Sequence, residues 1–210
     1  TPQAEKTAAI LRRFVEEGNR LLAAHPPANS FTLRGVAMDP GLPPFPEIYK
    51  LRAAAVAVYP MYKGVARLVG MDVLPHNAQT PAEQFAVVEE YWDDYDFFFV
   101  HIKKTDSYGE DGNFAAKVGV IEAVDAALPT LLALKPDVLL ITGDHSTPAK
   151  VRRHSWHPVP VLLAAETARR DPATAFGETA CRTGSLGPLH HVDLMPLALA
   201  HAMRLGKYGA

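Results

Sequence analysis

The sequence predicts an α/β protein built on a mostly parallel sheet that is flanked by helices. Apolar strand-like segments alternate with helix-like ones along the 210 residues, as in chains whose parallel strands are joined by crossover helices. Two of the strand-like segments, 96–102 (DFFFVHI) and 137–141 (DVLLI), are almost continuously apolar. Such short apolar runs are typical of strands that are covered on both faces.

The first stretch of the chain predicts one helix followed by weaker structure. Residues 2–24 carry apolar side chains at near-helical spacing with Glu and Arg on the other face, and His25 is followed by two prolines that end the helix. A short alternating strand is expected over 29–35. The prolines and the glycine of 39–46 predict a loop.

Two strands and two helices are expected next. Residues 53–59 (AAAVAVY) predict a buried strand, and Pro60 suits the first position of a helix that runs to residue 69. Residues 71–74 predict another short strand. Thr80 is followed by proline and then by glutamate at the third helical position, which predicts a capping box on a helix that ends near residue 92.

The second half carries the more strongly apolar strands. After the strand at 96–102, a polar loop is expected over 103–113 and a helix over 114–134, which Pro129 should kink or break. The strand at 137–141 follows. The remaining elements are expected at 158–164 (a strand), at 176–181 (a weak strand) and from Asp193 onward (a helix).

Charge and cysteine content exclude several classes of protein. A net charge of −2 gives no electrostatic footprint for nucleic acid or for an anionic membrane. No apolar run approaches the roughly 20 residues that a membrane-spanning helix needs. The single cysteine, Cys181, rules out an intrachain disulfide. A free thiol fits a reducing compartment, so we expect a cytoplasmic protein.

Acidic and imidazole side chains follow or precede the strongly apolar strands. The carboxyl ends of parallel strands lie at one edge of a sheet, where open α/β sheets bind ligands. Taken singly, each of these side chains fits a capping or solvated loop residue better than a metal ligand. Together, carboxylates and imidazoles that converge on one edge suit a pair of divalent ions. The candidate ligands are Asp106, Glu110, Asp144, His145, His154 and His157.

Two motifs in these segments are specific. They are GDHSTP followed by HSWHPVPVLL, and TDxxGxDG with a downstream K-V-x-x-I-E-x-x-D. Through them the chain resembles the cofactor-independent phosphoglycerate mutases of the alkaline phosphatase superfamily, most of all the archaeal type. The resemblance covers nearly the whole chain and is carried by residues 101–125, 141–149, 154–163 and 59–71, with weaker support from 176–181 and 184–187.

The resemblance implies an alkaline-phosphatase-like fold and two divalent ions, Mn²⁺, Mg²⁺ or Zn²⁺. By match with the family, the ligands are Asp106 and His154 for one ion and Asp144 and His145 for the other. Many relatives have a histidine ligand where this chain has Glu110. A carboxylate at that position favours Mg²⁺ or Mn²⁺, whereas His157 is an alternative source of the missing imidazole.

The resemblance also implies a role for the first part of the chain. The change from short to strongly apolar strands predicts a domain boundary near residue 95. Residues 1–95 then belong to a smaller α/β substrate-binding (lid) domain, and 96–210 form the C-terminal part of the metal-binding domain. Lys63 resembles a substrate-binding lysine, with Arg34 and Asn29 as its partners. Lysine and arginine suit phosphate and carboxylate groups, although these residues alone also fit ordinary surface charge.

The implied reaction is the interconversion of 3-phosphoglycerate and 2-phosphoglycerate in glycolysis, through a phosphoserine intermediate and without 2,3-bisphosphoglycerate. The nucleophilic serine of the family stands upstream of every motif quoted above, and no serine here lies in that context. We therefore expect the C-terminal part of a longer enzyme, without its N-terminal part. Alone, it should bind metal poorly and show no mutase activity. Two alternatives are another phosphatase or phosphomutase of the superfamily and a short, non-catalytic paralogue that binds a phosphorylated ligand.

Overall fold

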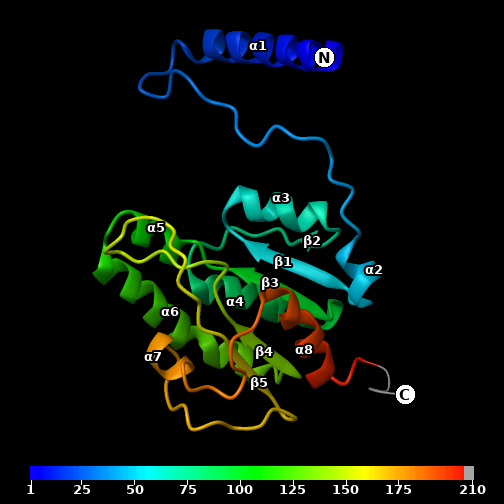
Figure 1. Cartoon of the computed structure of the whole chain (residues 1–210), viewed down its shortest axis with the longest axis vertical. Helices are drawn as coiled ribbons and strands as arrows, with labels where there is room; N and C mark the ends of the chain where they lie inside the picture. Colours follow the sequence, from blue (N-terminus) through cyan, green and yellow to red (C-terminus); the bar gives the residue numbers. More distant parts are fainter. Residues whose placement is uncertain (206–210) are drawn as a thin grey trace. The chain divides into compact units, whose positions relative to one another are not determined.

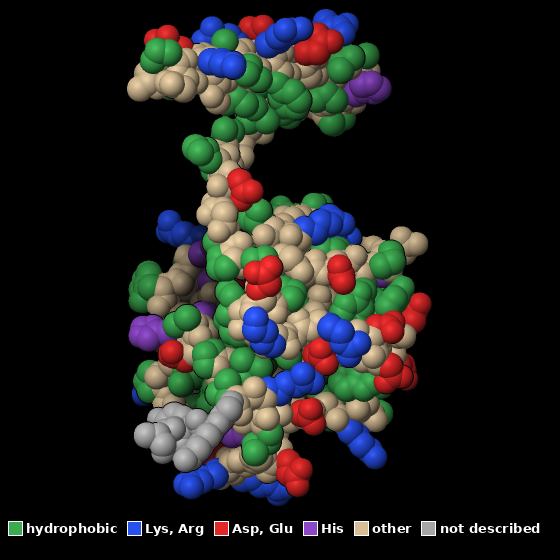
Figure 2. Space-filling view, turned by 90° about the vertical axis from the view of Figure 1, so that its right-hand side faces the viewer, with side chains coloured by type: hydrophobic (Ala, Val, Ile, Leu, Met, Phe, Trp, Pro, Cys, Tyr) green, Lys and Arg blue, Asp and Glu red, His purple; other side chains and the backbone are tan. Residues whose placement is uncertain are grey.

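The structure is a computed structural model that describes residues 1–205. It forms two compact units, which divide between Leu42 and Pro43. The first unit is built on α1 (Pro2–Leu22), which confirms the helix expected over 2–24. The hydroxyl of Thr1 caps this helix by accepting a hydrogen bond from the backbone N–H of Ala4 at 3.3 Å. Charged side chains gather on one side of α1 and apolar ones on the other (Figure 2), as the sequence pattern predicts.

The strand expected over 29–35 does not form, so that prediction is wrong. This segment packs against α1 instead. The ring of Phe31 meets that of Phe14 edge to face, with centroids 5.8 Å apart. Gly18 makes room for this contact, because a Cβ atom there would lie 2.2 Å from the Phe31 ring. An alternating pattern becomes a strand only beside a partner strand, and the first unit contains no strand that could pair with it.

The second unit, which begins at Pro43, contains the parallel sheet that the sequence predicts (Figure 1). The central strand β1 (Ala53–Ala57) lies between β2 (Asp72–Val73) and β3 (Phe97–His101), and both neighbours run parallel to it. The register sets Ala57 opposite His101, so β1 and β3 end at the same edge. All three strands fall within the ranges expected for them.

Helices cover both faces of this sheet (Figure 1). The helix α3 (Pro60–Leu68) lies on one side, and α4 (Pro81–Glu90) and α6 (Phe114–Ala133) lie on the other. The core forms where Ala54 and Val56 of β1 pack against Val88 of α4. The helices expected over 60–69, 80–92 and 114–134 are thereby confirmed.

The last two strands, β4 (Val138–Ile141) and β5 (Leu162–Ala165), form a separate antiparallel pair. Both strands were expected, but an antiparallel pair was not. Neighbouring parallel strands need a crossover connection, usually a helix. Residues 142–161 contain no helix, so the chain returns beside β4 in the opposite direction.

The segment expected to be a polar loop over 103–113 contains a helix, α5 (Lys104–Glu110), and that prediction is corrected. Gly112, at a φ of 72°, then turns the chain. The side chain of Asn113 caps the start of α6 by accepting from the N–H of Ala116 at 3.0 Å. The helical conformation matters for the site, since residues four positions apart on a helix lie on the same face.

The remaining elements differ from expectation at three places. The helix α6 does not break at Pro129, because packing against α4 offsets the lost backbone hydrogen bond. The weak strand expected over 176–181 is a short helix, α7 (Glu178–Cys181), in a stretch that pairs with no strand. A short helix in the proline-rich segment, α2 (Phe45–Tyr49), was not predicted.

The C-terminal helix confirms the expectation for the end of the chain. Two 3₁₀ turns, η1 (Trp92–Asp94) and η2 (His191–Asp193), lie in the second unit, and α8 (Leu194–His201) starts directly after the second of them. No helix among residues 1–205 is both long enough and apolar enough to cross a membrane. The predicted boundary near residue 95 falls inside the second unit, and the division of roles expected there stays a prediction.

Candidate functional site

Two strand ends of the second unit deliver the acidic side chains. Asp106 and Glu110 lie four residues apart on α5, which starts three residues after β3 ends. Asp144 and His145 lie in the turn that follows β4. Each pair therefore stands at the carboxyl end of a strand, where α/β folds place ligand-binding groups.

A third segment returns to the same place through a single backbone bridge. The N–H of Ser155 donates to the carbonyl oxygen of Ser146 at 2.9 Å, and the two residues form an isolated antiparallel β-bridge. This bridge sets His154 beside His145, with ring centroids 3.8 Å apart and ring planes at 30°. The two imidazoles thus come together although nine positions separate them in the sequence.

One carboxylate and two imidazoles form a compact donor cluster. Ligand atoms of Asp106, His145 and His154 all lie within 4.8 Å of one another. The Nε2 atom of His154 lies 3.4 Å from Oδ1 of Asp106 and 3.7 Å from Oε1 of Glu110. An oxygen donor with two imidazole nitrogens suits Zn²⁺, Mn²⁺ or a similar ion. The residues present therefore fit a divalent metal.

Asp106 is held ionised by its neighbours. Its side chain is only 15% exposed, and this burial alone would raise the pKa of the carboxyl group. The ammonium group of Lys103 and the hydroxyl of Thr147 both donate hydrogen bonds to it and together keep its pKa below the ordinary value. A metal ligand must be deprotonated to bind, so this environment prepares Asp106 for a cation.

Thr147 is a buried residue that contacts two members of the cluster. Its side chain hydroxyl lies 2.6 Å from Oδ1 of Asp106 and 3.1 Å from Nδ1 of His145, and the residue is 3% exposed. Its carbonyl oxygen accepts a 2.7 Å hydrogen bond from the ammonium group of Lys117 on α6. One threonine thus orients two of the three clustered donors.

Asp144 lies beside the cluster and has its own partners. Its Oδ2 atom accepts a 2.7 Å hydrogen bond from the hydroxyl of Tyr62 and lies 3.5 Å from Nε2 of His145. Burial would raise the pKa of this carboxyl group, but the Tyr62 hydroxyl and the nearby imidazole of His145 bring it below its ordinary value. The Asp144 side chain remains 55% exposed.

The other predicted site residues lie outside the compact cluster. His157 is exposed and shares a 2.9 Å hydrogen bond with the hydroxyl of Ser155. Lys63 lies in the first turns of α3, one position after Tyr62. Asn29 and Arg34 belong to the first unit, where both are exposed. Their expected contact with substrate stays a prediction.

Three residues of the site were not predicted from the sequence. Thr147 lies within the GDHSTP motif, Lys103 lies in the segment 101–125 that carries the resemblance, and Tyr62 directly precedes Lys63. A signal existed only for Lys103, because a lysine three positions before an aspartate is within reach of it once the segment is helical. The contacts of Thr147 and Tyr62 span 41 and 82 positions in the sequence, and no local pattern reveals them.

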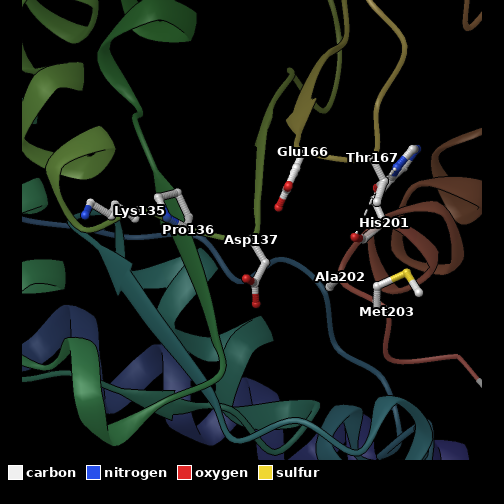
Figure 3. Close-up of a pocket in the computed structure, with 8 residues that line it drawn as sticks. All are labelled: Lys135, Pro136, Asp137, Glu166, Thr167, His201, Ala202 and Met203. Atoms are coloured by element: carbon white, nitrogen blue, oxygen red, sulfur yellow. Dashed lines mark hydrogen bonds between the residues drawn. The ribbon is translucent and has the colours of Figure 1, made fainter.

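A separate pocket of about 440 Å³ lies at the amino end of β4, at the other end of that strand from Asp144. Figure 3 shows the side chains of Asp137, Glu166 and His201 around it. Nδ1 of His201 shares a 2.7 Å hydrogen bond with the hydroxyl of Thr167. None of the predicted site residues lines this pocket.

Comparison with known proteins agrees with this geometry. A family model described as the metalloenzyme superfamily matches residues 37–201. Curated relatives carry the name "Probable 2,3-bisphosphoglycerate-independent phosphoglycerate mutase". The protein from Thermotoga neapolitana is 52% identical over 99% of this chain, and that from Aquifex aeolicus is 48% identical over 100% of it. The chain spans about half the length of these relatives, 51% in both cases.

Two solved structures share the fold. A Pyrococcus horikoshii protein matches the whole chain with a TM-score of 0.84 and 33% identity, and the match covers 60% of that protein. The cofactor-independent phosphoglycerate mutase from Thermoplasma acidophilum matches 96% of this chain with a TM-score of 0.67 and 25% identity, over 53% of its own length.

Proposed function

Because this chain belongs to the metalloenzyme superfamily, we propose that it supplies the metal-binding part of a phosphoglycerate mutase that does not use 2,3-bisphosphoglycerate. The reaction would interconvert 3-phosphoglycerate and 2-phosphoglycerate, as a step of glycolysis in the cytoplasm. The observation that carries this proposal is the meeting of Asp106, His145 and His154 within 4.8 Å of one another. The relatives at about 50% identity direct the choice among the activities that such a metal site allows.

We propose two divalent ions, with manganese as the preferred metal. The ions would neutralise the charge of a phosphoryl group and orient it for transfer. Asp106, Glu110 and His154 would hold one ion, and Asp144 and His145 the other. His157 is the alternative to Glu110 as the additional donor. Since ligand atoms of His145, Asp106 and His154 all lie within 4.8 Å of one another, the two ions would sit close together.

Basic residues of this chain would bind the phosphoglycerate anion. Lys63 stands near the start of α3, on the helix whose Tyr62 contacts Asp144. Arg34 and Asn29 are the proposed partners in the first unit. Guanidinium and ammonium groups are the usual partners of phosphate and carboxylate. Because the chain as a whole carries a net charge of −2, an anionic substrate would be attracted by a local group of basic side chains and not by the overall charge.

A hybrid protein tests the function. It would join this chain to the half of a curated relative that the chain does not match. We expect the hybrid to convert 3-phosphoglycerate to 2-phosphoglycerate with Mn²⁺ and without 2,3-bisphosphoglycerate, and we expect this chain alone to show no turnover. Release of free phosphate instead of 2-phosphoglycerate would assign a phosphatase. Binding of phosphoglycerate with neither activity would assign a non-catalytic phospholigand-binding protein.

A further inference from the structure

Tyr62 joins three segments of the second unit that are distant in the sequence. It lies in the first turns of α3, which follows β1. Its ring stacks on the imidazole of His101 at the end of β3, with centroids 3.4 Å apart and planes at 23°. Its hydroxyl donates a 2.7 Å hydrogen bond to Oδ2 of Asp144 in the turn after β4. The ends of β1, β3 and β4 are thus tied by one side chain.

The imidazole of His101, on which the Tyr62 ring stacks, is held by the sheet. His101 is the last residue of β3 and lies in register with Ala57 at the end of β1. Burial lowers the pKa of His101 to about 4, so its ring is neutral at neutral pH. The Tyr62 ring stacks on this imidazole, and from that position its hydroxyl reaches Asp144.

Asp144 depends on this contact for its orientation. Its Oδ1 atom accepts a 3.1 Å hydrogen bond from the neighbouring backbone N–H of His145, and its Oδ2 atom accepts from Tyr62. The side chain is 55% exposed, so packing alone does not fix it. Without the phenol hydroxyl, Oδ2 loses its only hydrogen-bond donor among residues 1–205 and keeps the longer 3.5 Å approach of Nε2 of His145, while Oδ1 keeps the local backbone contact.

We propose that Tyr62 is a positioning residue, which orients the Asp144 carboxylate for metal and links that ligand to the helix that carries Lys63. This inference rests on the proposed function in taking Asp144 as a metal ligand. Groups that hydrogen-bond to metal ligands and orient them typically contribute 10–100-fold to metal affinity. Lys63 is the next residue on α3. If an anion bound to Lys63 displaced this helix, the Tyr62 side chain would transmit the movement to Asp144.

The test compares two tyrosine-to-phenylalanine variants of this chain. Tyr62→Phe removes the hydroxyl and keeps the stack on His101. Tyr59→Phe is the matched control, because Tyr59 precedes the same helix, its ring lies 6.3 Å from that of Tyr62, and its hydroxyl makes no hydrogen bond to residues 1–205. Binding of Mn²⁺, read from the electron paramagnetic resonance signal of the free ion, should weaken about tenfold in Tyr62→Phe. It should stay unchanged in Tyr59→Phe.

A double-mutant cycle with Asp144→Asn shows whether the tyrosine acts through Asp144. We expect Tyr62→Phe to have no further effect on Mn²⁺ affinity once Asp144 is replaced, and thermal unfolding of the Tyr62→Phe chain to match that of the control. Equal affinity of the Tyr62→Phe and Tyr59→Phe chains would overturn the inference and leave the proposed metal site intact. An effect of Tyr62→Phe that persists in the Asp144→Asn background would also overturn it. If the unmodified chain shows no saturable Mn²⁺ binding, the metal assignment and this inference both fail.

Discussion

The hydroxyl of Thr147 donates a 2.6 Å hydrogen bond to Oδ1 of Asp106, which stands 41 positions earlier in the chain. This contact joins the helix after β3 to the turn after β4. It is also buried, because Thr147 is 3% exposed. A buried hydrogen bond to a charged group is stronger than an exposed one and costly to leave unmade. The site is therefore held together by packing around Thr147 as much as by its charged residues.

Replacing Gly109 by alanine should disturb this contact. A Cβ atom at Gly109 would lie 2.3 Å from the carbonyl oxygen of Thr147 and 2.9 Å from its Cγ2 atom. We expect the free energy of unfolding to fall by about 1–3 kcal/mol, as for other overpacked sites, and Mn²⁺ affinity to fall with it. Urea unfolding measures the first and a metal titration the second.

Gly119→Ala is the matched control for that substitution. Gly119 lies within α6 and a Cβ atom there meets nothing within 4 Å. Alanine should raise stability by about 1 kcal/mol, because it favours the helix over glycine, with no change in metal affinity. If both glycine variants behaved alike, close packing against Thr147 would not be the reason for glycine at 109.

The capping box at the start of α4 should contribute measurably to stability. The hydroxyl of Thr80 accepts from the N–H of Glu83 at 3.3 Å, and the carboxylate of Glu83 accepts from the N–H of Thr80 at 2.9 Å. The prediction made from the sequence is confirmed here. Thr80→Ala should lower the free energy of unfolding by about 1 kcal/mol, whereas Thr174→Ala, at an exposed position with no side-chain hydrogen bond to residues 1–205, should not. Equal stability of the two variants would contradict the role of the cap.

Asp96 should make stability depend on pH on the acid side. The guanidinium group of Arg52 donates hydrogen bonds to its carboxylate, with Arg204 also nearby, and this lowers the pKa of Asp96 from 3.8 to about 2. A carboxyl group whose pKa is lower in the folded state stabilises the fold above the unfolded-state value. That stabilisation is lost as the pH falls from about 4 to 2.

Asp96→Asn removes this contribution. We expect it to lower the free energy of unfolding by about 1–3 kcal/mol at pH 7, and the difference from the unmodified chain to shrink between about pH 4 and pH 2. Asp94→Asn, an exposed neighbour, is the control. Urea unfolding at a series of pH values measures both, and a difference that stays constant down to pH 2 would show that Asp96 is not the titrating group.

The choice between Glu110 and His157 as the additional metal donor can be decided by two substitutions. Oε1 of Glu110 lies 3.7 Å from Nε2 of His154, whereas His157 is exposed and bonded to Ser155. We therefore expect Glu110→Gln to weaken Mn²⁺ binding and His157→Ala to leave it unchanged. The opposite pattern in a metal titration would make His157 the ligand.

The parts of the fold that local pattern determines were predictable. The apolar runs at β1, β3 and β4 and the capped start of α4 follow from hydropathy and turn chemistry, and each was found where expected. The strand expected over 29–35 failed because strand formation depends on a partner, which no local pattern supplies. The polar helix α5 was missed because its sequence, KTDSYGE, has no apolar stripe.

The site was predictable as a set of residues but not as a geometry. The candidate ligands followed from strand ends and motifs, and three of them meet. Thr147 and Tyr62 hydrogen-bond to Asp106 and Asp144, which lie 41 and 82 positions away in the sequence. Such contacts depend on how the turns after β3 and β4 lie in space, which hydrophobic periodicity does not encode.

Binding of Mn²⁺ to the Asp106→Asn variant decides whether the cluster is a metal site. Asp106 supplies the carboxylate of the cluster that it forms with His145 and His154, and Asp111→Asn is the matched control, one residue beyond α5 and exposed. We predict weak but saturable binding by the unmodified chain and by Asp111→Asn, and binding at least tenfold weaker by Asp106→Asn. Equal affinity of the Asp106→Asn and Asp111→Asn chains for Mn²⁺ would contradict a metal centre at this position.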